Sequence, residues 1–318
     1  MTLYEIKHEI AHLASAELQT PDPEGTLWFF KELLGMYETH RSGASVYLRG
    51  YEDPYLWSLK VTEGPVAKMV HAGMRVSSPE ALERRAAVLA ESGLPGGWMD
   101  GEFGYGHTYW FHTPDGHEMR LHWEVEHYHA HPTMQSKILT RPSKKPLQGI
   151  PVKRIDHLNL LAADVTPVKE TFEQHLGMQT RERLVDGPVE HGAWLSSNLL
   201  AHELAIMRDG HGARGRMHHI AFFYGVQQHN FDAAEMFRDY NVMIEAGPDR
   251  HGLTQGAFLY VFEPGGHRVE LFGDPGILER EPDFDTKTWT MEDIDTVTAI
   301  GGAGLPRETY FTYGTPPV

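Results

Sequence analysis

Apolar and polar residues alternate in the second half of the chain in an order that repeats. Residues 154–162 (RIDHLNLLA) alternate with the period of two that is typical of a strand. The next segment, VTPVKETFEQHL, places Val168, Phe172 and Leu176 at helical spacing. Three shorter strand patterns follow, in residues 178–185, 193–198 and 202–207. The pattern therefore predicts a unit of one strand, one helix and three strands.

A second unit of the same kind follows directly. It begins with a strand pattern at 216–225 (RMHHIAFFYG) and a helical pattern at 230–240. Its shorter strand patterns lie at 242–246, 256–262 and 267–273. Each unit exposes one side of a small curved sheet, so two units must pair to enclose a cup in which a ligand can bind.

The first half of the chain repeats the second. Leu34-Gly35-Met36 matches Leu176-Gly177-Met178 at an offset of 142 residues, and FHTPDGHEMRLHW (111–123) matches FEPGGHRVELFG (262–273) at an offset of 150. We therefore predict an α+β fold with four βαβββ modules, arranged as two tandem domains.

The domain boundaries follow from composition. We expect an N-terminal domain at 1–132, a linker at 133–151, a C-terminal domain at 152–275 and a tail or lid at 276–318. The linker is polar and contains Pro and Lys, and the tail is rich in Pro, Gly and acidic residues. We predict little regular structure in the tail beyond a turn of helix.

Composition excludes several classes of function. The chain has 318 residues, 41% of them hydrophobic, and a formal net charge of −16, which argues against nucleic acid as a partner. There is no apolar run of membrane-spanning length and no signal-peptide core, and the absence of cysteine fits a cytoplasmic protein. With 21 histidines and no cysteine, any metal must be held by imidazole and carboxylate, a ligand set that suits Fe, Mn, Zn or Ni.

Three residues stand at corresponding points of the two C-terminal units. His157 and His219 lie near the start of the first strands, and Glu270 lies on the last strand. We expect His218 and His219 to face opposite sides of the sheet, and alignment with the strand of His157 selects His219. Two imidazoles and one carboxylate leave positions open on a non-haem ferrous ion. By spacing alone, a chance arrangement is an equal alternative.

The motifs of this half carry a resemblance. The strings RIDHLNL, AHELAIM, GRMHHIAFF, GPDRHGLTQGAFLYVFEPGGHRVELF and KTWT resemble the type I extradiol ring-cleaving dioxygenases of the vicinal-oxygen-chelate superfamily, catechol 2,3-dioxygenases in particular. The resemblance is close over the C-terminal half and loose over the N-terminal half. It implies one Fe(II), or alternatively Mn(II), held by His157, His219 and Glu270. It also implies a homo-oligomer, dimeric or tetrameric.

The resemblance places further residues around the metal. It implies that His202, His251 and Tyr260 line the substrate and oxygen side, and it makes Asn159 and Trp194 candidates for substrate binding together with His251. Ring opening needs a catechol that has lost a proton and a proton for a reduced oxygen, which a histidine supplies near neutral pH. We assign His202 as the acid–base candidate and Tyr260 as a hydrogen-bond donor. Taken singly, His202 could instead be a strand residue bonded to a backbone carbonyl, and His251 a loop residue. Tyr260, Asn159 and Trp194 could be packing residues.

The N-terminal half serves as an internal control. The repeat places Ser15 at the position of His157, Ala72 at that of His219 and Arg120 at that of Glu270. These residues do not make a metal site, so we predict one site per chain. The alternate histidines His127, His129 and His131 could bind a metal, but a solvated or interface strand is the preferred interpretation.

Substrate preference follows from missing arginines. Relatives that cleave carboxylated catechols carry arginines that would fall at Ala246 and near Thr296, although Arg250 and Arg307 remain nearby. We therefore favour catechol or an alkyl- or chloro-substituted catechol, cleaved with O2 to a 2-hydroxymuconic semialdehyde, in aromatic degradation. Homoprotocatechuate is the alternative substrate. A glyoxalase-like metalloenzyme and a non-catalytic small-molecule binding protein are rivals from other classes.

Overall fold

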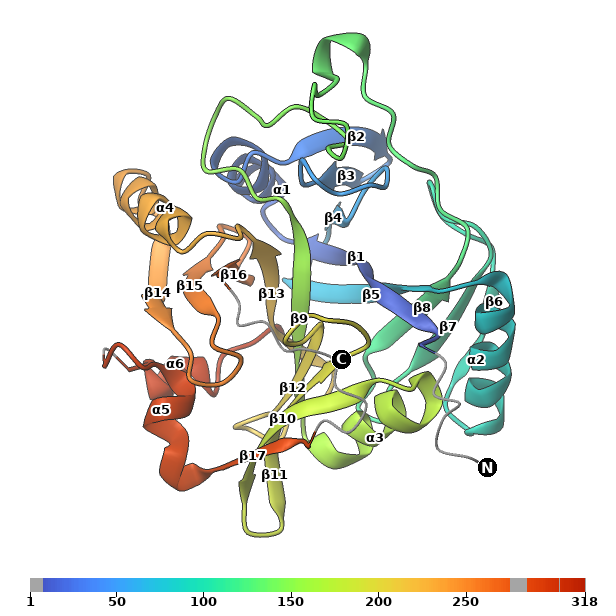
Figure 1. Ribbon diagram of the computed structural model, residues 1–318, viewed down its shortest axis with the longest axis vertical. Coiled ribbons are helices and arrows are strands. Elements are labelled where there is room, and N and C mark those ends of the chain that lie inside the picture. Colours follow the sequence, from blue (N-terminus) through green and yellow to red (C-terminus); the bar gives the residue numbers. More distant parts are fainter. Residues whose placement is uncertain (1–7, 275–284, 303, 318) are drawn as a thin grey trace.

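The computed structural model describes residues 8–274, 285–302 and 304–317, without the side chain of Arg307. Its strands form two mixed sheets (Figure 1). The first sheet has the order β2-β3-β4-β1-β5-β8-β7-β6. Its strands are β1 (Ile10–Thr20), β2 (Tyr37–Ser42), β3 (Ser45–Arg49), β4 (Leu59–Glu63), β5 (Lys68–Val76), β6 (Gly96–Met99), β7 (Thr108–His112) and β8 (Glu118–His122).

The second sheet has nine strands in the order β14-β15-β16-β13-β9-β12-β11-β10-β17. Its strands are β9 (Arg154–Ala162), β10 (Gln179–Asp186), β11 (Val189–Ser196), β12 (Leu204–Arg208), β13 (Arg216–Phe223), β14 (Met243–Arg250), β15 (Ala257–Phe262), β16 (Arg268–Gly273) and β17 (Lys287–Thr290). Up to β16, each sheet contains two βαβββ modules, which confirms the predicted fold class.

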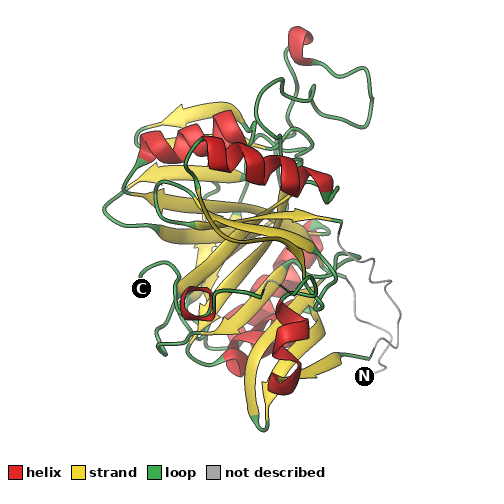
Figure 2. Cartoon of the chain, turned by 90° about the vertical axis from the view of Figure 1, so that its left-hand side faces the viewer, coloured by secondary structure: helices red, strands yellow, loops and turns green. Residues whose placement is uncertain are grey.

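One helix follows the first strand of each module and packs over a sheet (Figure 2). These helices are α1 (Pro23–Trp28), continued by a π-helical turn η1 (Phe29–Leu33), then α2 (Pro79–Glu91), α3 (Val165–Leu176) and α4 (Gln228–Asp239). Helix α3 begins and ends as predicted. Asp164 caps its first turn, and Gly177, with φ of 70°, ends it in the left-handed conformation that glycine adopts without strain. Val168, Phe172 and Leu176 are all buried on its inner face.

The two Pro-x-Gly turns of the repeat join the halves. In the first turn, the buried ring of His117 places Nε2 within 3.1 Å of the carbonyl oxygen of Leu161 and 2.9 Å of that of Arg216, both on the second sheet. In the second turn, Glu263 accepts a hydrogen bond from Thr26 of the first half at 2.7 Å. Each half therefore inserts one turn into the other, and helices α2 and α3 pack side by side.

The tail has more regular structure than the sequence predicted. Strand β17 pairs in parallel with β10 and extends the second sheet. A 3₁₀ turn η3 (Met291–Asp293) and the short helices α5 (Ile294–Thr298) and α6 (Arg307–Tyr310) follow. The prediction of a single turn of helix was therefore wrong, because the tail acquires its structure by packing on the sheet. Residues 275–284 of the predicted tail lie outside the described residues.

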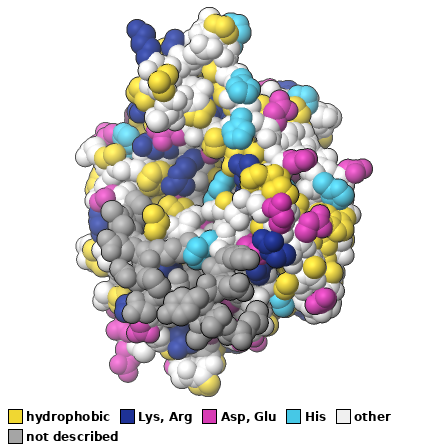
Figure 3. Space-filling model, turned by 45° about the vertical axis from the view of Figure 1, so that its right-hand side comes forward, with side chains coloured by type: hydrophobic (Ala, Val, Ile, Leu, Met, Phe, Trp, Pro, Cys, Tyr) yellow, Lys and Arg dark blue, Asp and Glu magenta, His cyan; other side chains and the backbone are white. Residues whose placement is uncertain are grey.

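The connection between the sheets contains one 3₁₀ turn, η2 (Pro132–Met134), and stands away from the body of the protein (Figures 2 and 3). None of the described helices is long and apolar enough to cross a membrane.

Candidate metal centre and active site

Three neighbouring strands bring the predicted metal ligands together. His157 lies on β9, His219 on β13 and Glu270 on β16, and these strands are adjacent in the sheet. The Nε2 atoms of His157 and His219 are 3.2 Å apart, and Oε2 of Glu270 lies 2.9 Å and 3.0 Å from them. All three side chains are buried. The fold thus brings together the predicted residues, which are up to 113 positions apart in the chain.

The geometry of the three ligand atoms fits a divalent ion. Three neighbouring positions of an octahedral ion with bonds of about 2.1 Å lie roughly 3.0 Å apart, close to the separations of 2.9–3.2 Å between these atoms. Oε1 of Glu270 is buried without a hydrogen-bond partner. Burial lowers the pKa of His157, but Glu270 and Asp156 together raise it to about 9, so a proton takes the place that a cation would hold.

Hydrogen bonds behind the two histidines fix their tautomers. Nδ1 of His157 donates to Asp156 at 2.9 Å, which leaves Nε2 free to bind a metal. For His219 the partner is His218, whose Nδ1 lies 2.6 Å from Nδ1 of His219 and whose Nε2 lies 2.6 Å from the carbonyl oxygen of Tyr310. Burial lowers the pKa of both His218 and His219, so both rings are neutral.

Only one arrangement of protons satisfies the hydrogen bonds from His219 through His218 to Tyr310. A carbonyl oxygen only accepts, so Nε2 of His218 carries its proton and Nδ1 of His218 is an acceptor. His219 must then carry its proton on Nδ1, and its Nε2 faces the metal position. The expectation that His218 and His219 face opposite sides was wrong. A register shift between Met217 and His219 in the pairing with β9 brings the two rings within 4.9 Å.

His202 lies beside the predicted metal ligands but not on a strand. The sequence predicted a strand from this residue, whereas β12 begins at Leu204 and His202 occupies the bend before it. Its ring centre is 4.0 Å from that of His157, and its buried Nδ1 has no hydrogen-bond partner. Burial lowers the pKa of His202 well below the usual value, so the ring is neutral and can accept a proton.

A hydrogen-bond chain crosses the opposite side of the site. Nδ1 of His251 donates to the carbonyl oxygen of Thr298 at 2.6 Å, and its Nε2 lies 3.1 Å from the hydroxyl of Tyr260 and 3.7 Å from Oε1 of Glu270. The hydroxyl of Tyr310 donates to that of Tyr260 at 3.1 Å. Burial raises the pKa of Tyr260 well above its usual value, so this hydroxyl keeps its proton. It can therefore donate to an oxygen at the site.

The loop of His251 is held in a strained shape. Thr254 and Gln255 both have positive φ, at 58° and 56°. Glu182 of β10 accepts a hydrogen bond from the backbone of Thr254 at 2.7 Å and another from the indole of Trp289 on β17 at 2.7 Å. This buried carboxylate thus ties the active-site loop to the tail.

All eight predicted site residues line one cavity of about 410 Å³, a size typical of small-molecule sites. They are His157, Asn159, Trp194, His202, His219, His251, Tyr260 and Glu270. The amide of Asn159 donates to the sulfur of Met207 at 3.0 Å, and its oxygen has no partner. Trp194 packs directly over Gly192, where any larger residue would collide with the indole.

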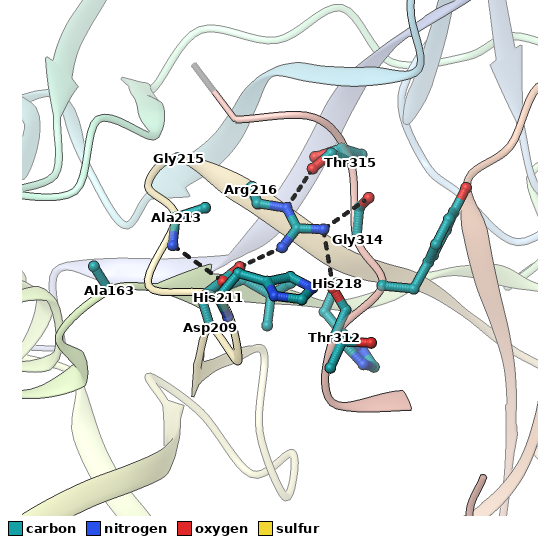
Figure 4. A network of polar contacts seen from close by, with 12 residues as sticks. Ala163, Asp209, His211, Ala213, Gly215, Arg216, His218, Thr312, Gly314 and Thr315 are labelled. Carbon is teal, nitrogen blue, oxygen red and sulfur yellow. Dashed lines mark hydrogen bonds and ion pairs between the residues drawn. The ribbon is translucent and has the colours of Figure 1, made fainter. Parts of the chain in front are cut away.

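Sequence reasoning missed the residues that the tail contributes to this cavity. Met291, Ile294, Val297, Thr298, Leu305, Tyr310 and Phe311 form its cover. Two buried arginines hold this cover in place. Arg216 donates to the carbonyl oxygens of Thr315, Thr312 and Gly314 at 2.7–3.3 Å and pairs with Asp209 (Figure 4). Arg268 donates to the carbonyl oxygens of Tyr313 and Thr309 at 2.8 Å and 3.2 Å. The aromatic string YFTYG near the end of the sequence was the available signal.

Comparison with known proteins agrees with this site. The model of the Glyoxalase/Bleomycin resistance protein/Dioxygenase superfamily matches residues 154–271. Metapyrocatechase of Geobacillus stearothermophilus is 43% identical over 310 residues, which cover 97% of this chain and 94% of that protein. The chain belongs to the extradiol ring-cleaving dioxygenases.

Two further relatives extend the comparison of this dioxygenase. The manganese-dependent 2,3-dihydroxybiphenyl 1,2-dioxygenase of Geobacillus genomosp. 3 is 33% identical, over 90% of this chain and 92% of that protein. The crystal structure of the 2,3-dioxygenase LapB from Pseudomonas sp. KL28 superposes with a TM-score of 0.82 at 25% identity. The superposition covers 90% of this chain and 99% of the LapB chain.

The first sheet of the dioxygenase has an ion-pair network at the position that corresponds to the metal centre. Glu17, His71 and Glu102 lie close enough to hold a metal. However, Lys60 lies 3.1 Å and 2.9 Å from the two carboxylates, and Arg120 is 3.2 Å from Glu102, so these side chains already supply the positive charge.

The sequence repeat placed Ala72 at the position of His219, and this alignment was wrong by one residue. Ser15 and Arg120 line a small hollow beside this network, as the repeat predicted. Ala72 is instead packed in the core, and His71 faces the hollow. One metal site per chain stays a prediction.

The cluster of alternate histidines does not form a strand. His127 makes an isolated bridge with Tyr55, and His127, His129 and His131 are exposed. Nδ1 of His131 lies 2.9 Å from the hydroxyl of Thr133. The residues are thus solvated, as one of the two predicted alternatives had it, but the predicted strand was wrong, because only His127 pairs with another backbone segment.

Proposed function

We propose that this dioxygenase opens catechol, or an alkyl- or chloro-substituted catechol, at the bond beside the diol. The product is of the 2-hydroxymuconic semialdehyde type, and the reaction belongs to aromatic degradation. The carbon–carbon bond next to one hydroxyl breaks, and both atoms of O2 enter the product, so no other oxidant is required. One observation supports this most directly: the His157, His219 and Glu270 triad faces a single cavity together with His202, His251 and Tyr260.

His157, His219 and Glu270 would hold Fe(II), with Mn(II) as the alternative. When bound, the ion would offer neighbouring positions to catechol and O2 and let electron density pass between them. The protein prepares this position by directing both Nε2 atoms and Oε2 of Glu270 to one point.

His202 would remove the proton that catechol loses on binding. Its ring is neutral, buried and 4.0 Å from that of His157, and its free Nδ1 can take a proton from a hydroxyl at the metal position. The same nitrogen can return the proton to an oxygen later in the reaction. Because Nδ1 has no hydrogen-bond partner in the protein, a substrate hydroxyl can donate to it without displacing another group.

His251 and Tyr260 would stabilise negative charge on the opposite side. Tyr260 keeps its proton and can turn it from His251 toward an oxygen at the site. His251 is held by the carbonyl of Thr298, so its Nε2 keeps its direction while Tyr260 reorients. Tyr310 donates to Tyr260 and so strengthens Tyr260 as a donor.

The walls of the cavity favour an uncharged ring substituent. Leu184, Leu253, Val297 and Leu305 line it. Among the described side chains of the lining, the one arginine or lysine is Arg208, which is exposed. Arg250 pairs with Asp274, and the side chain of Arg307 lies outside the described residues. A carboxylate would therefore lose its partner on entering, which places homoprotocatechuate second.

The test begins with apoprotein loaded with Fe(II) without air, followed by catechol and O2. We expect a yellow product with one O2 consumed per ring, no product from His157→Ala or Glu270→Ala, and slow turnover with bound iron retained in His202→Phe. Val66→Ser, on the surface, should behave as wild type. Bound iron without colour from any catechol would favour the glyoxalase-like enzyme, and failure to bind metal would favour the binding protein. A cytoplasmic location and a homo-oligomeric state stay predictions.

A further inference from the structure

The connection between the two sheets is far longer than the distance it spans. The backbone amide of Tyr128 donates to the carbonyl oxygen of Pro54 at 2.9 Å, and the carbonyl oxygen of Lys153 accepts from the amide of Glu52 at 2.9 Å. The chain therefore leaves and returns at the same short segment, residues 52–54. Residues 129–152, here called the arm, form an excursion that the connection itself does not require. Long loops of this kind are uncommon in compact domains and are usually functional.

The arm is held in one shape at its base. Arg49 is fully buried and donates to the hydroxyl of Ser143 at 3.0 Å, and its guanidinium lies 4.0 Å from the ring centre of Tyr128. The carbonyl oxygen of Lys144 accepts from the hydroxyl of Tyr37 at 3.0 Å. Burying a guanidinium is unfavourable unless it is well paired, so a flexible linker would not require such an anchor.

Large aliphatic side chains on the arm are exposed to water. Leu139 is 98% exposed, Leu147 is 105% exposed and Ile138 is 50% exposed. Among the large apolar residues of the described chain, these two leucines have the highest exposures. A fixed, projecting segment with fully exposed leucines is typical of a surface that another molecule covers.

The charge of the arm is opposite to that of the rest of the chain. The arm contains Lys137, Arg141, Lys144 and Lys145 and no acidic residue. The other residues include 24 basic and 44 acidic side chains, which gives them a formal net charge of −20. Figure 3 shows basic and hydrophobic side chains on the projection at the top of the molecule. The partner whose charge complements the arm is thus the body of the same protein.

We propose that the arm docks on the acidic body of a second copy of this chain. Two copies exchange arms across a twofold axis, so each arm buries its leucines on the other body while Lys137 and Lys145 face acidic side chains there. Arg141 and Lys144 are held within their own chain, 3.5 Å from Glu52 and 2.8 Å from the carbonyl oxygen of Thr133. No residue of the arm lines the cavity of its own chain. This assignment concerns assembly and is independent of the proposed substrate.

Sedimentation equilibrium of the metal-loaded full chain tests the proposal. A monomer has a mass of 36.0 kDa. We expect a multiple of this mass for wild type at micromolar concentration, a lower mass for Leu139→Ser/Leu147→Ser, and weaker assembly at 500 mM salt than at 50 mM. Val66→Ser, which replaces another exposed aliphatic residue, should retain the wild-type mass. Because the two leucines are exposed, circular dichroism should show an unchanged fold in all variants.

Charge reversal provides a second, independent test. Lys137→Glu/Lys145→Glu should dissociate the assembly, whereas Lys68→Glu/Arg238→Glu, with the same change in net charge, should not. A monomeric wild type, or a leucine variant that assembles like wild type, would overturn the proposal. Binding of monomeric wild type to vesicles of anionic lipid would overturn it in favour of a membrane surface.

Discussion

Replacement of His218 tests how the protein prepares the metal centre. His218 is not a predicted ligand, but it accepts the Nδ1 proton of His219 at 2.6 Å and donates to the carbonyl oxygen of Tyr310 at 2.6 Å. In His218→Leu, the buried Nδ1–H of His219 loses its acceptor, and the tautomer that a metal requires is no longer favoured.

The size of the effect follows from the hydrogen bond. Leaving a buried donor unsatisfied costs about 1–3 kcal/mol, and every 1.4 kcal/mol is tenfold in an equilibrium constant. Metal binding requires the Nδ1–H form of His219, so the cost reduces metal affinity directly. We expect the Kd for Fe(II) or Co(II) to rise by roughly 10- to 100-fold, the usual range for residues that orient metal ligands.

The assay is anaerobic titration of apoprotein with Co(II), followed by its visible absorption. His218→Gln offers one donor and one acceptor, so it should recover much of the lost affinity. His229→Gln, at a partly exposed histidine on α4, is the matched control and should bind as wild type. Wild-type affinity in His218→Leu, or equal loss in the Leu and Gln variants, would refute the proton count.

Four further outcomes follow from the structure. Tyr310→Phe removes the donor to Tyr260, and we expect kcat/KM with catechol to fall about 3- to 10-fold, equivalent to a bond worth 0.5–1.5 kcal/mol, while Val66→Ser, on the surface, stays near wild type in the same assay. Leu253→Arg adds a cation to the apolar wall and should raise kcat/KM for homoprotocatechuate relative to catechol; an unchanged ratio would count against the assigned wall. Elemental analysis should find one metal per chain, and two would show that Glu17, His71 and Glu102 also bind. The fourth outcome concerns stability in acid. Burial raises the pKa of Glu17 and Glu102, but His71 and Lys60 lower it to about 2. The two carboxylates therefore stabilise the folded state by roughly 1–3 kcal/mol each, and this contribution is present above pH 4.5 and lost as the pH falls toward 2. Urea unfolding of apoprotein from pH 6 to 3 should show this loss, and Glu17→Gln should reduce its slope.

The sequence predicted the elements of the second sheet because their patterns are local. Strand β9 and helix α3 begin and end where the alternation and the helical spacing placed them. The predicted metal ligands came from the resemblance of the motifs, because their positions in the repeated modules left a chance arrangement as an equal alternative; the structure brings the three side chains together. All eight predicted site residues line the same cavity.

Errors arose where tertiary contacts decide the outcome. A register shift places His218 beside His219, although strict alternation predicts opposite faces. The strand expected from His202 begins two residues later, at Leu204, where the pairing with Leu158 of β9 and Leu195 of β11 starts. Strand β17 exists only because the edge of β10 is available for pairing. None of these contacts leaves a local pattern in the sequence.

The tail shows most clearly why a site residue can be predicted while its state cannot. The carbonyl oxygen of Thr298 fixes His251, and the carbonyl oxygen of Tyr310 fixes His218 and, through it, His219. Every residue has a carbonyl group, so no side-chain pattern indicates which one will serve. The tautomers of two predicted site residues, His251 and His219, are thus set by the backbone of a segment with weak patterning.

A shortened chain separates this role from general stability. Ending the chain at Leu305 removes the carbonyl acceptors of Arg216 and Arg268 that lie in residues 309–315, but it also admits water to both guanidinium groups. Water replaces part of each lost bond, so we expect a lower melting temperature with the fold retained. Water can also reach His218, but it holds no fixed position there, so metal affinity should fall as in His218→Leu. A chain ended after Thr315 keeps all these acceptors and should match wild type. If the chain ended at Leu305 melts early but binds Co(II) normally, the tail stabilises the fold without setting the histidine tautomers.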